Sequence, residues 1–329
     1  MLAYKHRYEP QSMNGLTDIP GILVGHATDT EALTGCTVIL CGSDAVGGVD
    51  IRGSATGTCE IEALNPGHVA PNIHAICLAG GSAFGLEASS GVRRVLERRG
   101  IGFNAGVAHV PIVPSAILFD LGIGKPGVRP DREMGEKATN AAHGGPVEEG
   151  NVGAGTGASV GKLFGMKQAM KSGIGTASLT IGPKIIVAAL VAVNALGDVM
   201  DPNTRKIIAG ARKSPQSREF IDSTAMLRHG VPVGGFGRTN TTLAVVATNA
   251  KLDRVQTNKL AALASLGVAR TISPVNTMSD GDITFAISLG HETATIDELG
   301  VTAAEALATA IVRAVRSAKS VAGIPGLAG

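Results

Sequence analysis

The segment 238–249 constrains the fold most, because it places small polar side chains at the mouth of a strand that belongs in a core. Residues 243–247 form a continuous apolar, β-prone run that opens on Asn240, Thr241 and Thr242, as expected for a buried strand. The local pattern alone favours a strand that simply begins with β-branched threonines. A hydroxyl at the first residue of a buried strand is also held rigidly yet within reach of a substrate, as a nucleophile must be.

Apolar strands and helices follow one another in mixed order along the rest of the chain. We expect strands at 21–26, 35–41, 73–79, 178–181, 185–193 and 283–289, and helices at 86–99, 131–142, 252–264 and 302–318. Thr302 and Glu305 fit a capping box for the last helix. Pro111 and Pro114 break the apolar run 110–120, which predicts an edge or irregular segment. The mixed order indicates a layered α+β fold rather than a doubly wound sheet.

The chain does not divide into domains by charge or composition. Residues 1–15 are polar and are predicted to form a flexible tail, so residues 16–329 are expected to form one domain. The polar stretch 201–239 is the best candidate for a long linker. Aromatic residues make up only 3% of the chain while Gly contributes 45 residues, so the core must rely on small aliphatic side chains, with glycine allowing layers to approach closely.

Charge and cysteine content exclude several classes of protein. The 29 basic and 27 acidic residues give a net charge of +2 without a basic run, so we expect no nucleic-acid partner. Four cysteines without a CxxC pair are expected to be reduced. No apolar run reaches 18 residues and the first residues lack a signal-peptide pattern, which predicts a soluble cytoplasmic protein without a membrane partner.

The glycine-rich stretch 153–162 invites a phosphate-binding interpretation that fails in detail. A P-loop needs Gly where Thr156 stands and Ser or Thr where Leu163 stands. Two interpretations of Lys162 stay open: a tight glycine loop that presents it to a site, or a solvated surface lysine. The histidines are scattered without an HExxH pattern, so we expect neither a metal nor a cofactor. The chain also lacks a GxSxG motif.

Two further polar groups lie beside predicted strands. Asp280 and Asp282 flank a glycine directly before the strand at 283–289; Asp-Gly is a common turn, but the pair also places two carboxylates at a strand mouth. Asn194 ends an unbroken apolar strand, where a bare amide is either a turn former or an oxyanion donor.

Six motifs together resemble those of the self-processing DmpA-type aminopeptidases. The resemblance covers nearly the whole chain, and its motifs keep the family's order. They are residues 50–60, 76–87, 110–120 and 153–162, the triplet Asn240-Thr241-Thr242, and Asp280-Gly281-Asp282. The family includes L-aminopeptidase/D-amidase-esterases, β-aminopeptidases and nylon-oligomer endohydrolases.

The resemblance implies a four-layer αββα sandwich of the DmpA/ornithine-acetyltransferase type. It also implies a precursor that cuts itself between Asn240 and Thr241, giving an α chain of residues 1–240 and a β chain of residues 241–329. Thr stands where the aminopeptidases use Ser, as in the nylon-oligomer branch. The Asp280/Asp282 pair replaces a Ser-x-Glu pair, so the substrate is less defined than the reaction.

The same resemblance assigns a role to each site residue. Thr241, with Thr242 as the adjacent alternative, would be the nucleophile, and its new α-amine would act as its general base. Lys162 would lower the pKa of the nucleophile's groups. Asn194 would donate to the oxyanion. Asp280 and Asp282 would orient the hydroxyl and amine of Thr241.

The expected activity is hydrolysis of short peptides or amino-acid amides, with β-peptides or amide oligomers as further options. An acyltransferase of the ornithine-acetyltransferase kind, or an uncut inactive relative, is the alternative. A homotetramer or other homo-oligomer of αβ units is the expected assembly.

Overall fold

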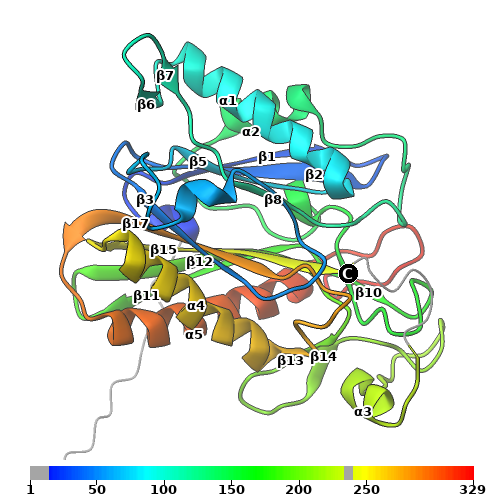
Figure 1. Ribbon diagram of the computed structural model, residues 1–329. Coiled ribbons are helices and arrows are strands. Elements are labelled where there is room, and N and C mark those ends of the chain that lie inside the picture. The colour runs from blue at the N-terminus through cyan, green and yellow to red at the C-terminus, as the bar shows by residue number, and fades with distance from the viewer. Residues whose placement is uncertain (1–14, 233–239) are drawn as a thin grey trace, which may run out of the picture.

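Two five-stranded sheets lie face to face in the computed structural model, which describes residues 15–232 and 240–329 (Figure 1). The first sheet has the order β1-β2-β5-β8-β4 and the second the order β11-β12-β15-β17-β3. Helices cover the outer face of each sheet. The four layers therefore run α, β, β, α, and the predicted sandwich is confirmed.

The first sheet is built entirely from the N-terminal part of the chain. Its strands are β1 (Leu23–Asp29), β2 (Thr34–Leu40), β4 (Gly57–Cys59), β5 (Ala75–Ala79) and β8 (Ser115–Ile117). Its outer face packs on α1 (Ala88–Arg98) and α2 (Arg132–Ala141) through a cluster that includes Val38, Val92 and Leu96. Asp131 caps α2 by accepting a hydrogen bond from the Met134 N–H.

The second sheet joins strands from both ends of the chain. Its strands are β3 (Val46–Ile51), β11 (Ile174–Ile181), β12 (Ile185–Asn194), β15 (Thr241–Ala250) and β17 (Ile283–Glu292). Its outer face packs on α4 (Arg254–Thr271) and α5 (Ile296–Arg316). β15 pairs antiparallel with β12 and parallel with β17.

Glycine brings helices and sheets close together, as the composition predicted. A Cβ added at Gly175 in β11 would lie 2.1 Å from the Ala310 carbonyl oxygen of α5. A Cβ added at Gly48 in β3 would lie 2.5 Å from the backbone of Thr257 in α4. Only glycine permits these approaches, so layers of small residues pack densely without aromatic side chains.

Shorter elements connect the layers. They are the 3-10 helices η1 (Leu16–Asp18), η2 (Ile61–Leu64), η3 (Ser82–Glu87) and η4 (Gly153–Gly155), the short helix α3 (Ser223–Arg228), and the strands β6 (Phe103–Asn104), β7 (His109–Val110), β9 (Ser159–Val160), β10 (Met170–Lys171), β13 (Asp198–Met200), β14 (Ile207–Ala209) and β16 (Ile272–Ser273).

Several local predictions differ from the structure; one is the capping box at Thr302, because α5 begins at Ile296. The run 110–120 is irregular over most of its length, as one of the two alternatives predicted, but it also supplies β8, which lies inside the first sheet rather than at its edge. Part of the predicted linker 201–239 forms β14 and α3, while 233–239 lies outside the described residues. Gly15, the last residue of the predicted tail, is buried, and its N–H donates to Asp18; residues 1–14 are not described.

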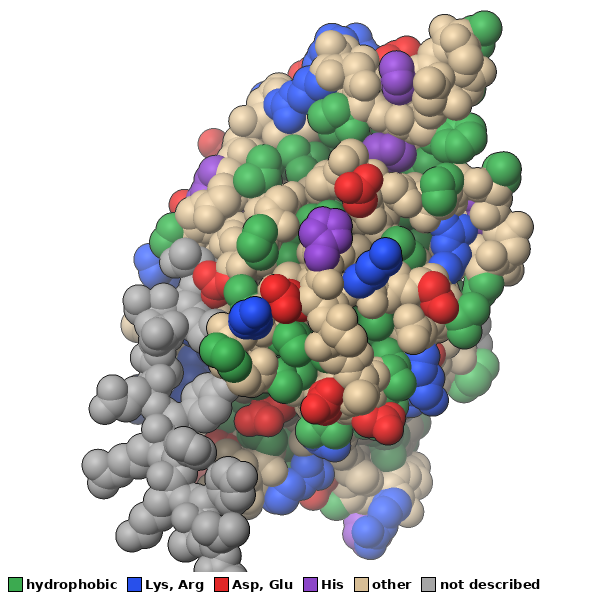
Figure 2. Space-filling view, turned by 90° about the vertical axis from the view of Figure 1, so that its left-hand side faces the viewer, with side chains coloured by type: hydrophobic (Ala, Val, Ile, Leu, Met, Phe, Trp, Pro, Cys, Tyr) green, Lys and Arg blue, Asp and Glu red, His purple; other side chains and the backbone are tan. Residues whose placement is uncertain are grey.

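Charged side chains of both signs are interspersed over the face shown in Figure 2. Cys36, Cys41, Cys59 and Cys77 are all free thiols, as predicted. Among the helices of residues 15–232 and 240–329, none combines the length and apolar character needed to cross a bilayer.

Candidate active site

The two-residue period of the central strands decides which side chains meet. In β15, Leu243, Val245 and Ala247 belong to the core between the sheets, while Ala244 and Val246 belong to the core under the helices. Thr241 therefore faces the space between the sheets, and Thr242 faces the helices. Asn194, at the end of β12, is the cross-strand partner of Thr241 and also faces the space between the sheets.

The Thr241 hydroxyl lies beside the bond that precedes it. Thr241 Oγ1 donates to the Asn240 carbonyl oxygen at 2.6 Å. The same oxygen accepts a second hydrogen bond from the Gly281 N–H, at 2.7 Å. Asn240 Nδ2 donates to the Ser279 carbonyl oxygen at 3.2 Å. A carbonyl that accepts two hydrogen bonds is polarised, and its carbon is more open to attack.

Lys162 is buried and bound to the neighbouring strand. Its Nζ donates to the Asn194 backbone oxygen at 2.9 Å and to Asn194 Oδ1 at 2.8 Å. Burial lowers the pKa of Lys162 to about 7, although the charge of Asp280 acts in the opposite direction. The interpretation as a solvated surface lysine is therefore wrong, because Lys162 is buried at the end of the glycine-rich stretch.

Asn194 links Lys162 to the first sheet. Its Oδ1 accepts from the Ser159 N–H at 3.1 Å as well as from Lys162. Its Nδ2 donates to the Phe119 carbonyl oxygen at 3.0 Å. The amide end therefore stands 2.8 Å from an ammonium group and is oriented from three directions.

The two carboxylates are buried and hold the backbone around Thr241. Asp282 accepts from the Thr242 N–H at 2.7 Å and from the Asn276 N–H at 3.0 Å. Asp280 Oδ2 accepts from the Thr277 N–H and hydroxyl, at 2.9 and 2.6 Å. Burial, and then the charge of Asp280, raise the pKa of Asp282 to about 7. Asp282 thus binds the backbone next to Thr241 rather than its hydroxyl.

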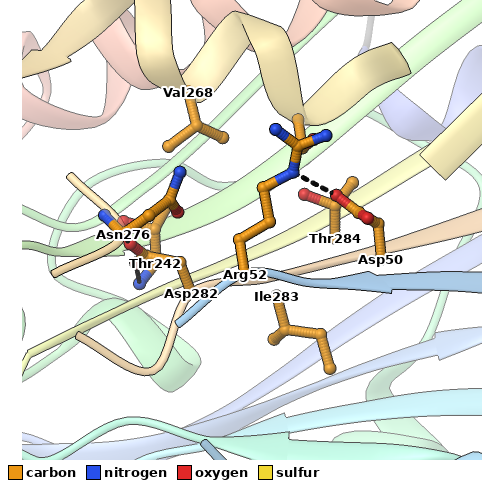
Figure 3. Close-up of a pocket in the computed structure, with 9 residues that line it drawn as sticks. Asp50, Arg52, Thr242, Val268, Asn276, Asp282, Ile283 and Thr284 are labelled. Carbon is orange, nitrogen blue, oxygen red and sulfur yellow. Dashed lines mark hydrogen bonds and ion pairs between the residues drawn. The ribbon is translucent and has the colours of Figure 1, made fainter. Parts of the chain in front are cut away.

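A small cavity lies on the helix side of Asp282 (Figure 3). Asp282, Thr242 and Asn276 line one side of it. The ion pair of Arg52 with Asp50, with 2.6 Å between Nε and Oδ2, lines the other. Motif 50–60 also holds the backbone of Asp282, because the N–H groups of Arg52 and Gly53 donate to the Asp282 carbonyl oxygen.

Two buried charges beside the site, Asp120 and Lys171, were not predicted. Lys171 Nζ donates to the carbonyl oxygens of Thr156 and Ala158, at 2.9 and 2.6 Å. Asp120 accepts from the Thr34 hydroxyl and the Gly81 N–H. Burial lowers the pKa of Lys171 to about 7 and raises that of Asp120. Motif 110–120 was a signal for Asp120, but nothing in the sequence around Lys171 marks it as buried.

The five predicted site residues converge on one end of the second sheet. Thr241, Asn194 and Lys162 meet between the sheets, while Asp280 and Asp282 hold the backbone beside them. In the described part of the chain, no three His, Cys, Asp or Glu side chains gather as metal ligands would. The arrangement combines a hydroxyl, a polarised carbonyl, a cation and two carboxylates.

Comparisons with known proteins identify the family of the chain. Residues 14–328 match the model of peptidase family S58. An uncharacterized aminopeptidase of Mycobacterium leprae is 41% identical, over 95% of this chain and 93% of that protein. A 6-aminohexanoate-oligomer endohydrolase of Kocuria sp. is 33% identical, over 82% of this chain and 74% of its own length.

Among solved structures, a β-aminopeptidase of Burkholderia sp. matches with a TM-score of 0.68 and 26% identity. The match covers 97% of this chain and 92% of that one. Sequence and fold thus point to a hydrolase of peptide or amide bonds. The chain belongs to peptidase family S58.

Proposed function

We propose that this protein cuts its own chain between Asn240 and Thr241, and that Thr241 then acts as the N-terminal nucleophile of an amide hydrolase. The observation that supports this most is the 2.6 Å hydrogen bond from Thr241 Oγ1 to the Asn240 carbonyl oxygen, which also accepts from the Gly281 N–H. The nucleophile and the bond to be broken are already side by side.

The cut proceeds through an N→O acyl shift. Thr241 Oγ1 attacks the Asn240 carbonyl carbon, the Asn240–Thr241 C–N bond breaks, and the hydroxyl proton passes to the departing nitrogen. The resulting ester is hydrolysed by water, which leaves a carboxylate on Asn240 and a free α-amine on Thr241. An α-amine has a pKa of about 7.7–8.0, so near neutral pH it serves as the base for its own hydroxyl.

The mature reaction repeats these steps on a substrate. Thr241 Oγ1 attacks an amide carbonyl, the amine product leaves with a proton, and water hydrolyses the acyl-enzyme. Asn194 Nδ2 supplies a donor for the oxyanion and the buried Lys162 a nearby positive charge. Short peptides or amino-acid amides are the proposed substrates, supported by the aminopeptidase and oligomer-hydrolase relatives.

Intact-mass spectrometry of three proteins tests the proposal. Wild type and Thr241→Ser are expected as two chains with a new N-terminus at residue 241, and both hydrolyse amino-acid anilides. Thr241→Ala is expected as one chain of 329 residues without hydrolysis. Full activity of Thr241→Ala would overturn the proposal. Acetyl transfer to glutamate without amide hydrolysis would favour the acyltransferase alternative. A wild-type protein that is neither cut nor active would favour the uncut inactive relative.

The assembly and location belong to the same proposal. A homotetramer or other homo-oligomer of αβ units is what the family resemblance implies, and the cytoplasmic location is proposed because no apolar run of the sequence reaches 18 residues. Light scattering of the purified protein measures the mass of the assembly directly, and the mass of a single αβ unit would contradict the proposed oligomer.

A further inference from the structure

Asp120 and Lys171 both contact one turn of the glycine-rich loop. The Lys171 ammonium binds the carbonyl oxygens of Thr156 and Ala158. Between them, Gly157 lies against Asp120, since an added Cβ would lie 2.4 Å from Asp120 Cβ and 3.0 Å from its Oδ2. A buried cation and a buried anion thus fix a turn that has no side chain of its own to anchor it.

This turn leads directly to the site. The next residue, Ser159, donates its N–H to Asn194 Oδ1, and Lys162 follows three positions later. On the other side, the residue before Asp120 is Phe119, whose carbonyl oxygen accepts from Asn194 Nδ2. Displacement of the turn would therefore move both the acceptor and the donor contacts of Asn194.

We propose that Asp120 and Lys171 are positioning residues, a buried pair of opposite charges that holds Asn194 and Lys162 in place for the proposed reaction. Neither residue touches the Asn240–Thr241 bond in the structure. Three of the six motifs, 76–87, 110–120 and 153–162, meet at this pair. Gly80 is part of the same cradle, because an added Cβ there would lie 2.0 Å from Asp120 Oδ2.

The pair acts on Lys162 with opposite signs. Among the described residues, four charged groups affect the Lys162 ammonium: Asp280, Asp282 and Asp120 raise its pKa, and Lys171 lowers it. Loss of the Lys171 charge must therefore raise the pKa of Lys162, and loss of the Asp120 charge must lower it. Asp120 keeps its hydrogen bonds from Thr34 and Gly81 without Lys171, so its carboxylate stays in place. A purely structural role predicts no such opposition.

The test measures the titration of Lys162 by ¹³C NMR of labelled lysine, with Lys162→Met to assign the signal. All variants carry Thr241→Ala, so the measurement does not depend on catalysis. Lys171→Met is expected to move the titration to higher pH, Asp120→Asn to lower pH, and the double variant to return it toward the starting value. Asp198→Asn is the control, since Asp198 is equally buried but accepts from Ala211 and Ser223, and it should move nothing.

Activity provides the second readout, which rests on the proposed function. With Thr241 intact, Lys171→Met is expected to lower kcat at least tenfold with little change in KM, because it misplaces groups that act in the transition state. Lys171→Arg, which keeps the charge, should recover part of that loss. Shifts in the same direction, or none, in a folded protein would overturn the inference. Opposite shifts in a protein that never hydrolyses amides would retain it and reject the proposed function.

Discussion

Gly281 occupies a position that leaves no room for a side chain. Its N–H donates to the Asn240 carbonyl oxygen, and an added Cβ would lie 2.8 Å from Thr241 Oγ1 and 2.7 Å from the Ala55 carbonyl oxygen. We expect Gly281→Ala to slow self-cleavage about 100-fold, because a shift of about 1 Å at a reacting group has that effect. Cleavage is followed by denaturing gels over time after synthesis in a cell-free system.

Gly127→Ala is the matched control for this substitution. Gly127 is exposed, and no atom lies within 4 Å of an added Cβ there. That variant should cut at the wild-type rate. A Gly281→Ala protein that cuts as fast would show that the Thr241 hydroxyl is not held where the hydrogen bonds place it.

Asp282 predicts how the rate depends on pH. Burial and the charge of Asp280 raise its pKa to about 7. Below that pH the carboxyl is protonated, so one oxygen becomes a donor and no longer accepts from Thr242 or Asn276. We expect kcat/KM for an anilide substrate to fall as pH decreases through about 7.

The variant Asp282→Asn separates this carboxyl from other groups that titrate near pH 7, such as the α-amine of Thr241. An amide keeps one acceptor but turns a donor toward either the Thr242 or the Asn276 N–H. The rate should fall roughly 10–100-fold, as for loss of a charge-assisted contact, and the part of the acid limb that comes from Asp282 should disappear. An unchanged acid limb would assign it to the other groups that titrate near pH 7, the α-amine of Thr241 and Lys162.

At the scale of elements, the last helix begins earlier than its sequence first indicates. The helix α5 starts at Ile296, where Thr295 and Glu298 form a capping box, and Thr302 lies inside it. Thr295→Ala should lower the free energy of unfolding by about 1 kcal/mol, since it removes the cap. Thr302→Ala should change it far less, because Thr302 only donates to the Glu298 carbonyl oxygen. Urea denaturation of both variants compares them, and equal losses would contradict this assignment.

The same helix shows why sequence located elements better than their ends. The sequence holds two matches to the box pattern, at Thr295 and at Thr302, and nothing local decides between them. Packing decides between them, because Leu299 is buried in the core under the second sheet and the helix must begin before it to place it there. The presence of strands and helices could be predicted from apolar periodicity, because the periodic pattern does not depend on where an element begins or ends.

Strand β8 illustrates a different failure. Pro111 and Pro114 argued for an edge, since proline has no N–H for a ladder. Both prolines lie before the paired residues Ser115–Ile117, and the Pro114 carbonyl oxygen still accepts from the Cys77 N–H. The two prolines therefore lie in the segment that leads into β8, and they do not prevent β8 from being an internal strand.

In the candidate site, too, residues next to periodic elements were easier to predict than residues held by irregular loops. The positions of Thr241, Asn194 and Asp282 could be predicted because each stands at the end of a strongly apolar strand, but their roles came only from the family resemblance. Lys171 could not be predicted, because a lysine beside Met170 looks like any surface lysine until the carbonyl oxygens of Thr156 and Ala158 surround it. Those oxygens come from a loop with no periodic pattern.

For the molecule as a whole, a cut before Thr241 would separate two chains that share one sheet. The strand order is β11-β12-β15-β17-β3. The internal strands β15 and β17 belong to residues 241–329, while β11, β12 and β3 belong to residues 1–240. The β-chain strands are thus flanked on both sides by α-chain strands (Figure 1). Separation would break two ladders and expose both cores.

We therefore expect the two chains to remain together after cleavage. On size-exclusion chromatography in native buffer they should elute as one peak, and they should part only in denaturant. Cleavage breaks one bond at the end of β15 and no packing between layers, so cut wild type and uncut Thr241→Ala should unfold at similar urea concentrations. Separate elution of residues 241–329 under native conditions would show that the β12–β15 and β17–β3 ladders do not hold the two chains together.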